Sequence, residues 1–521
     1  MYIMVDKAYL LTDAEMRNFI VNGYVVVKAD FPAGFHEAIY QKTKMAFEKE
    51  GNPGNNLLPR IPEIQEVFNH PAVRGALTSV LGPNYIMHSH RHPHYNPPGS
   101  TGQNLHKDSY WGYQKVRHHR PWWAMALYYP QDVTEENGPT AILPATQYLM
   151  TRTHDDSEVE LPIYGEAGTV TIIHFDLWHR AMPNRSLNPR YMMKFQFTRM
   201  EAPQQPSWNA ENPMWIEPRL SEQSEDTRSL KTPGVLRTTG GLVNHQVMWR
   251  HLWNWSSGNG LSPEKAASPS ANGGVSQWMK ALGDADASVR LKAADALGLM
   301  AESAQDAIPA LRGALGDASE PVGLNAAYAL GAIGERAVPA LMEALRDASE
   351  SVRLNAAYGL GAVSTPAVPM LVEALGDVSE PVRRYAAYAL ALMGQSAQDA
   401  VPALIQALGD ASELVRRYAI EVLGTMGQSA QDAVPALIET LLRDTDGQVR
   451  FDAALALARI GQSAHDAVPA LIKALKDENR YVRDNAVVAL HRIGTPEAHD
   501  ALFHYLLTTR WCPSTTKEST F

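Results

Sequence analysis

The residues best suited to chemistry in this chain are two histidines, an aspartate and an arginine in a fixed order. His106 and Asp108 are separated by one residue, His179 follows about seventy residues later, and Arg190 comes eleven residues after His179. Two imidazoles and one carboxylate on one face of an octahedral metal leave three positions open for further ligands. Because this donor set suits Fe(II) and O₂, the sequence predicts an iron site formed by His106, Asp108 and His179.

Each of these residues has a simpler explanation when it is considered alone. His106 and Asp108 could be a surface pair, His179 a core histidine bonded to the backbone, and Arg190 a surface arginine. The combined order favours the metal site, since His106 and Asp108 would point to the same side of a strand. Arg190 begins a predicted strand, and its planar guanidinium matches the carboxylate of an acidic co-substrate.

Other histidines compete for these roles. His174 is an alternative distal ligand, but Trp178 beside His179 and the distance to Arg190 favour His179. A second metal site is disfavoured because no acid or cysteine accompanies the remaining histidines at ligand spacing. We expect these to form a pocket wall or surface; they are His88, His90, His92, His94, His118 and His119.

The elements that must position the site differ between the two halves of the chain. Residues 12–15 form a capping box that predicts a helix, and short strands alternate with Gly/Pro turns after residue 85. This pattern predicts a double-stranded β-helix (jelly roll, cupin-like) with flanking helices. The predicted strands are 24–27, 85–90, 123–129, 140–143, 169–175 and 191–198, and residues 200–255 are predicted to be irregular and to pack on the barrel.

The downstream half is built from about seven repeats of 30 to 34 residues. Each repeat predicts two helices, the first with an early Pro and the second ending at a Gly such as Gly394 or Gly427. An Asp near the end of the first helix and an Arg early in the second recur, which predicts a ladder between units, broken where Gly323 replaces the Arg. One helix pair cannot bury its apolar face alone, so the units must stack into an α-solenoid. The repeats resemble the short bacterial HEAT repeats of phycobilisome-lyase-like proteins.

We therefore expect an oxygenase-type domain at residues 1–255, a linker at 256–274, the solenoid at 275–507 and a polar tail at 508–521. Tyrosines recur in the solenoid at helical spacing. Core packing is the simpler explanation for them, and a concave recognition surface is the alternative. These tyrosines are Tyr328, Tyr358, Tyr385, Tyr388 and Tyr418.

The upstream half resembles the phytanoyl-CoA dioxygenase family of Fe(II)- and 2-oxoglutarate-dependent oxygenases. The segments that carry the resemblance are 11–27, 103–108 (Gln-Asn-Leu-His-Lys-Asp), 136–140 (Glu-Asn-Gly-Pro-Thr) with 143–144, 177–186 and 189–190. The usual Pro-Gly-Ser-His is replaced by Pro-Ala-Thr-Gln at 144–147, a departure outside the metal set that would affect the pocket wall or nothing.

The resemblance implies roles for named residues. His106, Asp108 and His179 would hold Fe(II), and Arg190 would hold 2-oxoglutarate, while Trp122 or Trp123 would lie against the co-substrate. Reaction with O₂ would give succinate and CO₂ and oxidise a substrate C–H bond. The presence of Asp108 favours hydroxylation or a related hydrogen abstraction over halogenation, in which a small residue replaces the carboxylate.

The sequence is compatible with several functions. The first is oxidation of a small organic molecule, such as a specialised metabolite or a lipid-derived acid. The second is the same chemistry on a protein or carrier-tethered substrate recruited by the repeats. A non-enzymatic scaffold is the third, against which the intact site residues count, and a chromophore lyase is suggested only by the repeat type.

Composition narrows the cellular setting. The formal net charge of -10 argues against general binding to nucleic acid, and no segment has the apolar length of a membrane helix. Cys512 is the one cysteine, so no intramolecular disulfide can form. With no basic and apolar leader at the N-terminus, we expect a soluble, cytoplasmic protein.

Overall fold

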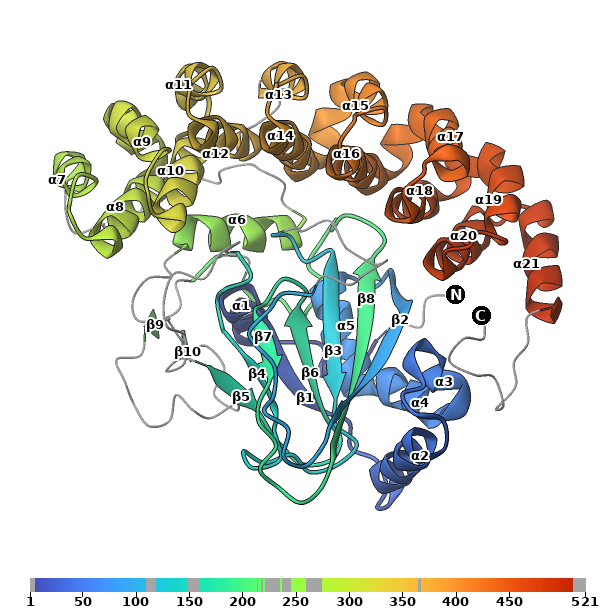
Figure 1. Ribbon diagram of the computed structural model, residues 1–521. Helices are drawn as coiled ribbons and strands as arrows, with labels where there is room; N and C mark the ends of the chain where they lie inside the picture. Colours follow the sequence, from blue (N-terminus) through green and yellow to red (C-terminus); the bar gives the residue numbers. More distant parts are fainter. Residues whose placement is uncertain are drawn as a thin grey trace.

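The computed structural model consists of a β-rich domain beneath an arc of helices (Figure 1). It describes residues 5–108, 119–148, 160–212, 214–216, 219–220, 235–236, 245–258, 274–363 and 367–508. Most of the predicted linker 256–274, the predicted tail 508–521 after its first residue, and His118 therefore lie outside the described residues. No helix in the described part of the chain is long and apolar enough to cross a membrane.

A five-stranded antiparallel sheet forms the floor of the β-rich domain. Its strand order is β1-β6-β3-β8-β2, so β3 and β8 are central and β2 is an edge strand. The strands are β1 (Tyr24–Lys28), β2 (Tyr85–Asn96), β3 (Trp123–Tyr128), β6 (Thr169–His174) and β8 (Arg190–Arg199). Helices lie against its outer face; they are α1 (Asp13–Asn22), α2 (Phe35–Glu50), α3 (Leu57–Arg60), α4 (Glu63–Asn69) and α5 (Pro71–Leu81).

A smaller antiparallel sheet covers the interior face of the large one (Figure 1). Its order is β5-β4-β7, with strands β4 (Thr140–Ile142), β5 (Leu161–Ile163) and β7 (His179–Ala181). The two sheets form the predicted double-stranded β-helix. A further pair, β9 (Arg219–Leu220) and β10 (Val235–Leu236), is parallel and lies apart from both sheets.

Local sequence explains the first elements. Thr12 and Glu15 form the predicted capping box, and α1 ends at Gly23, whose φ of 80° is left-handed. The strand predicted at 85–90 is longer than expected, because β2 continues through Pro93 to Asn96. Pro lacks a backbone N–H and is tolerated on an edge strand, which is the place of β2 in the sheet.

Residues 246–256 correct the prediction of an irregular 200–255 segment. They form helix α6 (Gln246–Ser256), which lies between the β-domain and the arc of helices. Trp249 and Trp253 are fully buried there, and Trp255 packs on Trp122 of the β-rich domain at 6.0 Å between ring centroids. The expectation that the Trp-rich segment packs on the barrel is confirmed.

The arc is the predicted solenoid, with seven helix pairs and a final helix in the described residues. The first helix of each pair lies on the convex side and the second on the concave side, facing the β-domain (Figure 1). The pairs are α7 (Val275–Ala281) and α8 (Ala287–Met300), α9 (Ile308–Ala314) and α10 (Glu320–Ile333), α11 (Val338–Ala344) and α12 (Glu350–Gly361), α13 (Val368–Ala374) and α14 (Glu380–Met393), α15 (Val401–Ala407) and α16 (Glu413–Met426), α17 (Val434–Arg443) and α18 (Gly447–Ile460), and α19 (Val468–Ala474) and α20 (Arg480–Ile493), followed by α21 (Pro496–Thr508).

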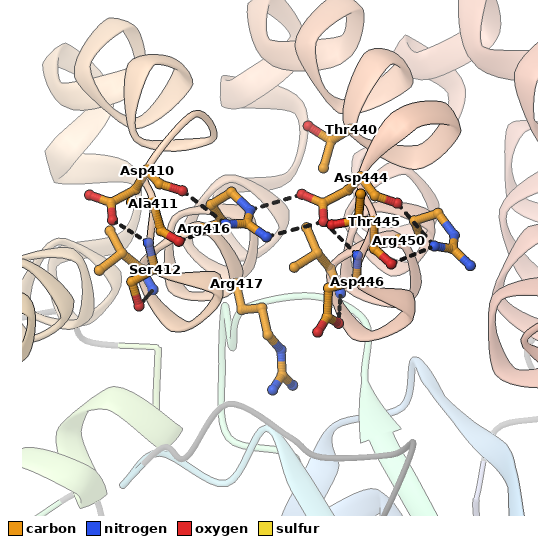
Figure 2. A network of polar contacts seen from close by, with 12 residues as sticks. Asp410, Ala411, Ser412, Arg416, Arg417, Thr440, Asp444, Thr445, Asp446 and Arg450 are labelled. Atoms are coloured by element: carbon orange, nitrogen blue, oxygen red, sulfur yellow. Dashed lines mark hydrogen bonds and ion pairs between the residues drawn. The ribbon is translucent and has the colours of Figure 1, made fainter.

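The predicted Asp–Arg ladder joins successive units (Figure 2). Arg416 donates from Nε to Asp444 Oδ2 at 2.8 Å and from Nη2 to Asp444 Oδ1 at 3.1 Å. Its Nη1 also donates to the backbone oxygen of Asp410 in its own unit, at 2.9 Å. At the rung that Gly323 breaks, Asn355 donates instead to the Leu315 backbone oxygen at 2.7 Å.

Candidate active site

A two-residue antiparallel bridge brings the predicted metal-binding histidines together. His106 N donates to His179 O and His179 N donates to His106 O, both at 3.0 Å. The two ring centroids are 4.7 Å apart. His179 is the first residue of β7, so the small sheet fixes both residues although His106 lies outside any named strand.

Both histidine rings are oriented by backbone carbonyls. His106 Nδ1 lies 2.8 Å from Asn104 O, and His179 Nδ1 lies 2.9 Å from Leu177 O. A carbonyl oxygen can only accept, so Nδ1 of each ring carries the proton in these bonds. The Nε2 atoms are then the nitrogens left available for a metal, in the arrangement by which proteins commonly orient histidine ligands.

Asp108 completes a set of three donors. One potential ligand atom from each of His106, Asp108 and His179 lies within 4.8 Å of the others, and no second such group occurs in the part of the chain that the structure describes. Asp108 Oδ1 is 3.6 Å from His179 Nε2. Two imidazoles and a carboxylate fit Fe(II) by their chemistry and leave open positions.

An unpredicted lysine accompanies the carboxylate. Lys194, on β8, donates from Nζ to Asp108 Oδ1 at 3.1 Å and to Oδ2 at 2.9 Å. Burial alone would raise the pKa of Asp108, but the charge of Lys194 and the contact with His179 hold that pKa well below its usual range. The pKa of His106 is lowered by burial and by His179, and that of His179 is raised by Asp108 despite burial.

Arg190 starts β8 and is fully buried, four residues before Lys194 on the same face of the strand. Its Nε and Nη2 donate to the Gly138 backbone oxygen at 2.9 and 2.7 Å, which fixes the guanidinium plane. Nη1 is buried and has no hydrogen-bond partner among the described residues. A buried N–H group without a partner is unfavourable, and a carboxylate oxygen of an acidic co-substrate would accept a hydrogen bond from Nη1. The position of Arg190 therefore fits such a co-substrate.

The aromatic ring beside Arg190 is that of Tyr129, with the guanidinium carbon 6.0 Å from the ring centroid. Of the two predicted tryptophans, Trp123 lies on the interior face of β3, opposite Thr198, and packs edge-on against His88. Trp122 faces the other way and packs on Trp255 at 6.0 Å. Trp123 is therefore the one of the two that shares the interior face with Arg190.

The competing histidines have other partners. His174 Nδ1 accepts from Asp176 N, and its Nε2 lies 3.2 Å from His119 O, so His174 takes no part in the three-donor group. His92 and His94 are cross-strand neighbours of Lys194 and Met192. His88, His90 and His119 lie against the solenoid.

The departure at 144–147 is structural. Ala145 adopts φ 65°, a conformation that favours glycine, at the position where the resemblance predicts Gly. Gln147, in place of His, donates to the backbone oxygens of Ile20 and Val21 at 3.1 and 3.2 Å and so ties this loop to α1.

Comparison with known protein families agrees with the resemblance predicted for each half of the chain. Residues 22–192 match the family model of phytanoyl-CoA dioxygenase, and four overlapping matches between residues 275 and 511 are to HEAT repeats. The chain joins a phytanoyl-CoA dioxygenase domain to HEAT repeats. The dioxygenase domain contains all six residues that the sequence singled out: the three donors, Arg190, Trp122 and Trp123.

Several solved structures are similar to part of the chain. One is the non-haem α-ketoglutarate-dependent carbocyclase SnoK from nogalamycin biosynthesis, at 17% identity over 38% of this chain and 88% of that one, with a TM-score of 0.31. Another is HygX from Streptomyces hygroscopicus with nickel and 2-oxoglutarate bound, at 13% identity, 36% and 88% coverage and a TM-score of 0.30. A third is AviO1 from Streptomyces viridochromogenes Tue57, at 16% identity, 37% and 96% coverage and a TM-score of 0.30.

Proposed function

We propose that this protein is a non-haem Fe(II)- and 2-oxoglutarate-dependent dioxygenase that hydroxylates a C–H bond of a small organic molecule. The observation that carries the proposal is the convergence of His106, Asp108 and His179 within 4.8 Å in a domain of the matching family. Bound Fe(II) would couple the decarboxylation of 2-oxoglutarate to succinate and CO₂ with the use of O₂ to oxidise the substrate carbon.

The chain's own residues would prepare this chemistry in advance. His106 and His179 offer Nε2 to the metal because their Nδ1 protons are committed to backbone carbonyls. Asp108 supplies the one anionic ligand. Arg190 would donate from Nη1 to the distal carboxylate of 2-oxoglutarate, with its plane already set by Gly138. Little reorganisation is then needed when the co-substrate arrives.

Metal binding and succinate release test the proposal. Full-length protein should bind one equivalent of Co²⁺ or Fe(II) and release succinate with Fe(II), ascorbate and 2-oxoglutarate. His106→Ala and His179→Ala should lose both, because each removes one of three ligands. His174→Gln is the matched control, a buried histidine near the site that should keep one equivalent of metal. If His174→Gln loses the metal and His179→Ala retains it, the ligand assignment is wrong.

We infer that the HEAT repeats cover the dioxygenase domain, since tyrosines on their concave face bond to it. The Tyr328 and Tyr358 hydroxyls lie within hydrogen-bond distance of the His119 ring, and His119 N donates to Tyr388 Oη at 3.2 Å. Arg120 Nη1 donates to the Ala391 backbone oxygen at 3.4 Å. These tyrosines are buried, so the concave surface, for which a recognition role was the alternative to core packing, contacts the protein's own domain.

A second contact covers the end of the large sheet where β8 finishes. Arg459, on α18, donates from Nη2 to Thr198 Oγ1 at 3.2 Å. The hydroxyl of Tyr481, on α20, lies 2.9 Å from His90 Nδ1 and accepts from Asn55 Nδ2 at 3.1 Å. Because the concave face is occupied in this way, recruitment of a protein substrate to it is disfavoured, and a small molecule is the better candidate.

Cleavage between the domains tests this role. A protease site inserted between residues 259 and 273 of the full chain would give two fragments. They should stay together on size-exclusion chromatography at micromolar concentration, because the contacts are numerous and buried. Fragments that separate and individually remain folded would contradict the covering role and restore a recruiting one.

A further inference from the structure

Lys194 is a buried cation placed directly on the anionic member of the three-donor group. Its side chain is 1% exposed and that of Asp108 is 2% exposed. Lys194 lies on the central strand β8, where its cross-strand neighbours are His92 on β2 and Leu127 on β3. Desolvating a lysine is costly unless it is paired, and Lys194 is paired with Asp108.

The two oxygens of Asp108 are not equivalent. Oδ1 lies 3.6 Å from His179 Nε2, on the histidine side, whereas Oδ2 is the closer of the two to Lys194 Nζ, at 2.9 Å against 3.1 Å. A metal held by Nε2 of His106 and His179 would therefore reach Oδ1 first. Oδ2 would remain bonded to Lys194.

We propose that Lys194 is a positioning residue that restricts Asp108 to one-oxygen coordination and lowers the affinity of the site for the metal dication in favour of the anionic co-substrate. This inference rests on the proposed function. A carboxylate that bound through both oxygens would occupy one of the three positions that 2-oxoglutarate and O₂ need. With Oδ2 committed to Lys194, those positions remain open.

The charge of Lys194 acts in the same direction. Lys194 and Arg190 lie on one face of β8, separated by about 13 Å along the strand. A dication at Asp108 would be repelled by the ammonium group a few ångströms away, in surroundings where such interactions are weakly screened. A dianionic co-substrate placed between the metal and Arg190 would be attracted by the same charge.

The sign of one measurement separates this role from simple orientation of Asp108. If Lys194 only oriented the carboxylate, its removal would weaken metal binding by about 10- to 100-fold, as for other groups that orient metal ligands. If Lys194 also limits Asp108 to one-oxygen coordination and repels the metal dication, its removal would strengthen metal binding.

The test is a titration of the full-length protein with Co²⁺ by calorimetry, with the visible Co²⁺ spectrum recorded in parallel. Lys194→Met keeps the length of the side chain without its charge and should bind Co²⁺ at least tenfold more tightly, with a spectrum showing higher coordination. The Co²⁺-loaded variant should bind 2-oxoglutarate at least tenfold more weakly. Lys194→Gln retains an N–H donor and removes the charge, so it tests the proposal if Lys194→Met does not fold.

Lys107→Met is the matched control. Lys107 is buried and stands between His106 and Asp108 in the sequence, but its Nζ donates to the Gln147 backbone oxygen, at 3.4 Å. Its removal should change Co²⁺ affinity less than threefold. Unchanged or weaker Co²⁺ binding by the folded Lys194 variants would overturn the inference. Failure of the unmodified protein to bind Co²⁺ would instead overturn the proposed function.

Discussion

The solenoid contains two sets of ion pairs between Arg and Asp or Glu. One set links successive repeats, and the other lies on the concave face. The ladder pairs recur from unit to unit and are partly exposed, as in Arg416–Asp444, whose side chains are 14% and 10% exposed. The concave face holds two further pairs, Arg417–Asp452 and Arg459–Glu421, that do not repeat. Figure 2 shows Arg417 pointing away from the ladder, toward the dioxygenase domain.

The difference separates architecture from domain contact. A pair that recurs in each unit stabilises the stacking of units, which every repeat protein requires. A pair confined to one or two units depends instead on a contact outside the repeats. Here that contact is with the dioxygenase domain, because Arg459 also bonds to Thr198 and lies 4.9 Å from the Trp122 ring centroid. Departures from the repeat therefore mark where the second domain is held.

The largest effect is expected from breaking a concave pair. Arg459→Met leaves Glu421 buried without its partner and removes the bond to Thr198, so unfolding should become easier by about 3–5 kcal/mol. The urea midpoint followed by tryptophan fluorescence measures this. The double variant Arg459→Met with Glu421→Leu should recover most of the loss, because it removes the stranded charge. A loss below about 1 kcal/mol in the single variant would contradict the burial argument.

Acid should weaken the domain contact next most strongly. Burial lowers the pKa of His245 to about 4, partly offset by its bond to Asn325, and burial with the charge of Arg120 lowers that of His251 to about 3. The unfolded chain binds more protons than the folded one between these values and the ordinary pKa near 6.5, so stability falls as pH drops through that window. At pH 5 each histidine should cost about 2 kcal/mol.

Thermal midpoints between pH 7.5 and 5 measure this loss. His245→Asn should have a shallower pH dependence than the unmodified protein, since one of the buried histidines with a lowered pKa no longer titrates. An unchanged slope would show that His245 does not contribute.

Single hydrogen bonds across the contact should have a smaller effect. Tyr481→Phe removes the hydroxyl that bonds His90 and Asn55, and about 1 kcal/mol should be lost for each bond. A double-mutant cycle with Asn55→Ala in the full chain isolates one of them, with an expected coupling of about 0.5–1.5 kcal/mol. Zero coupling would contradict a direct bond between the solenoid and the dioxygenase domain.

The repeats and the three donors could be predicted because their information is local or ordered along the chain. For example, a Gly marks the end of the second helix in most repeats, and Gly394 and Gly427 both adopt φ 57° at helix ends. The partners of the concave tyrosines could not be predicted, because helical spacing shows which face is apolar but not what covers it. Three-residue strands such as β5 and β7 are too short for an alternating pattern to identify.

Lys194 shows the same limit at the site. A lysine in a strand usually faces solvent, and nothing in the sequence around it indicates otherwise. Its burial follows from the register of β8 between β2 and β3, a non-local property. Tyr129 and the bond from Arg190 to Gly138 depend on the same long-range pairing.

Breaking a ladder pair should give the smallest loss of stability of the variants considered. Asp410→Asn weakens the charge-assisted bonds from Arg383, which are 2.8 and 3.0 Å long, at a site 14–17% exposed. About 1 kcal/mol should be lost, since water partly screens the pair and the asparagine oxygen still accepts. The loss should shrink between 0.1 and 0.5 M salt, whereas that of Arg459→Met should not. Equal salt dependence in the two variants would mean that the concave pairs and the ladder are the same kind of contact.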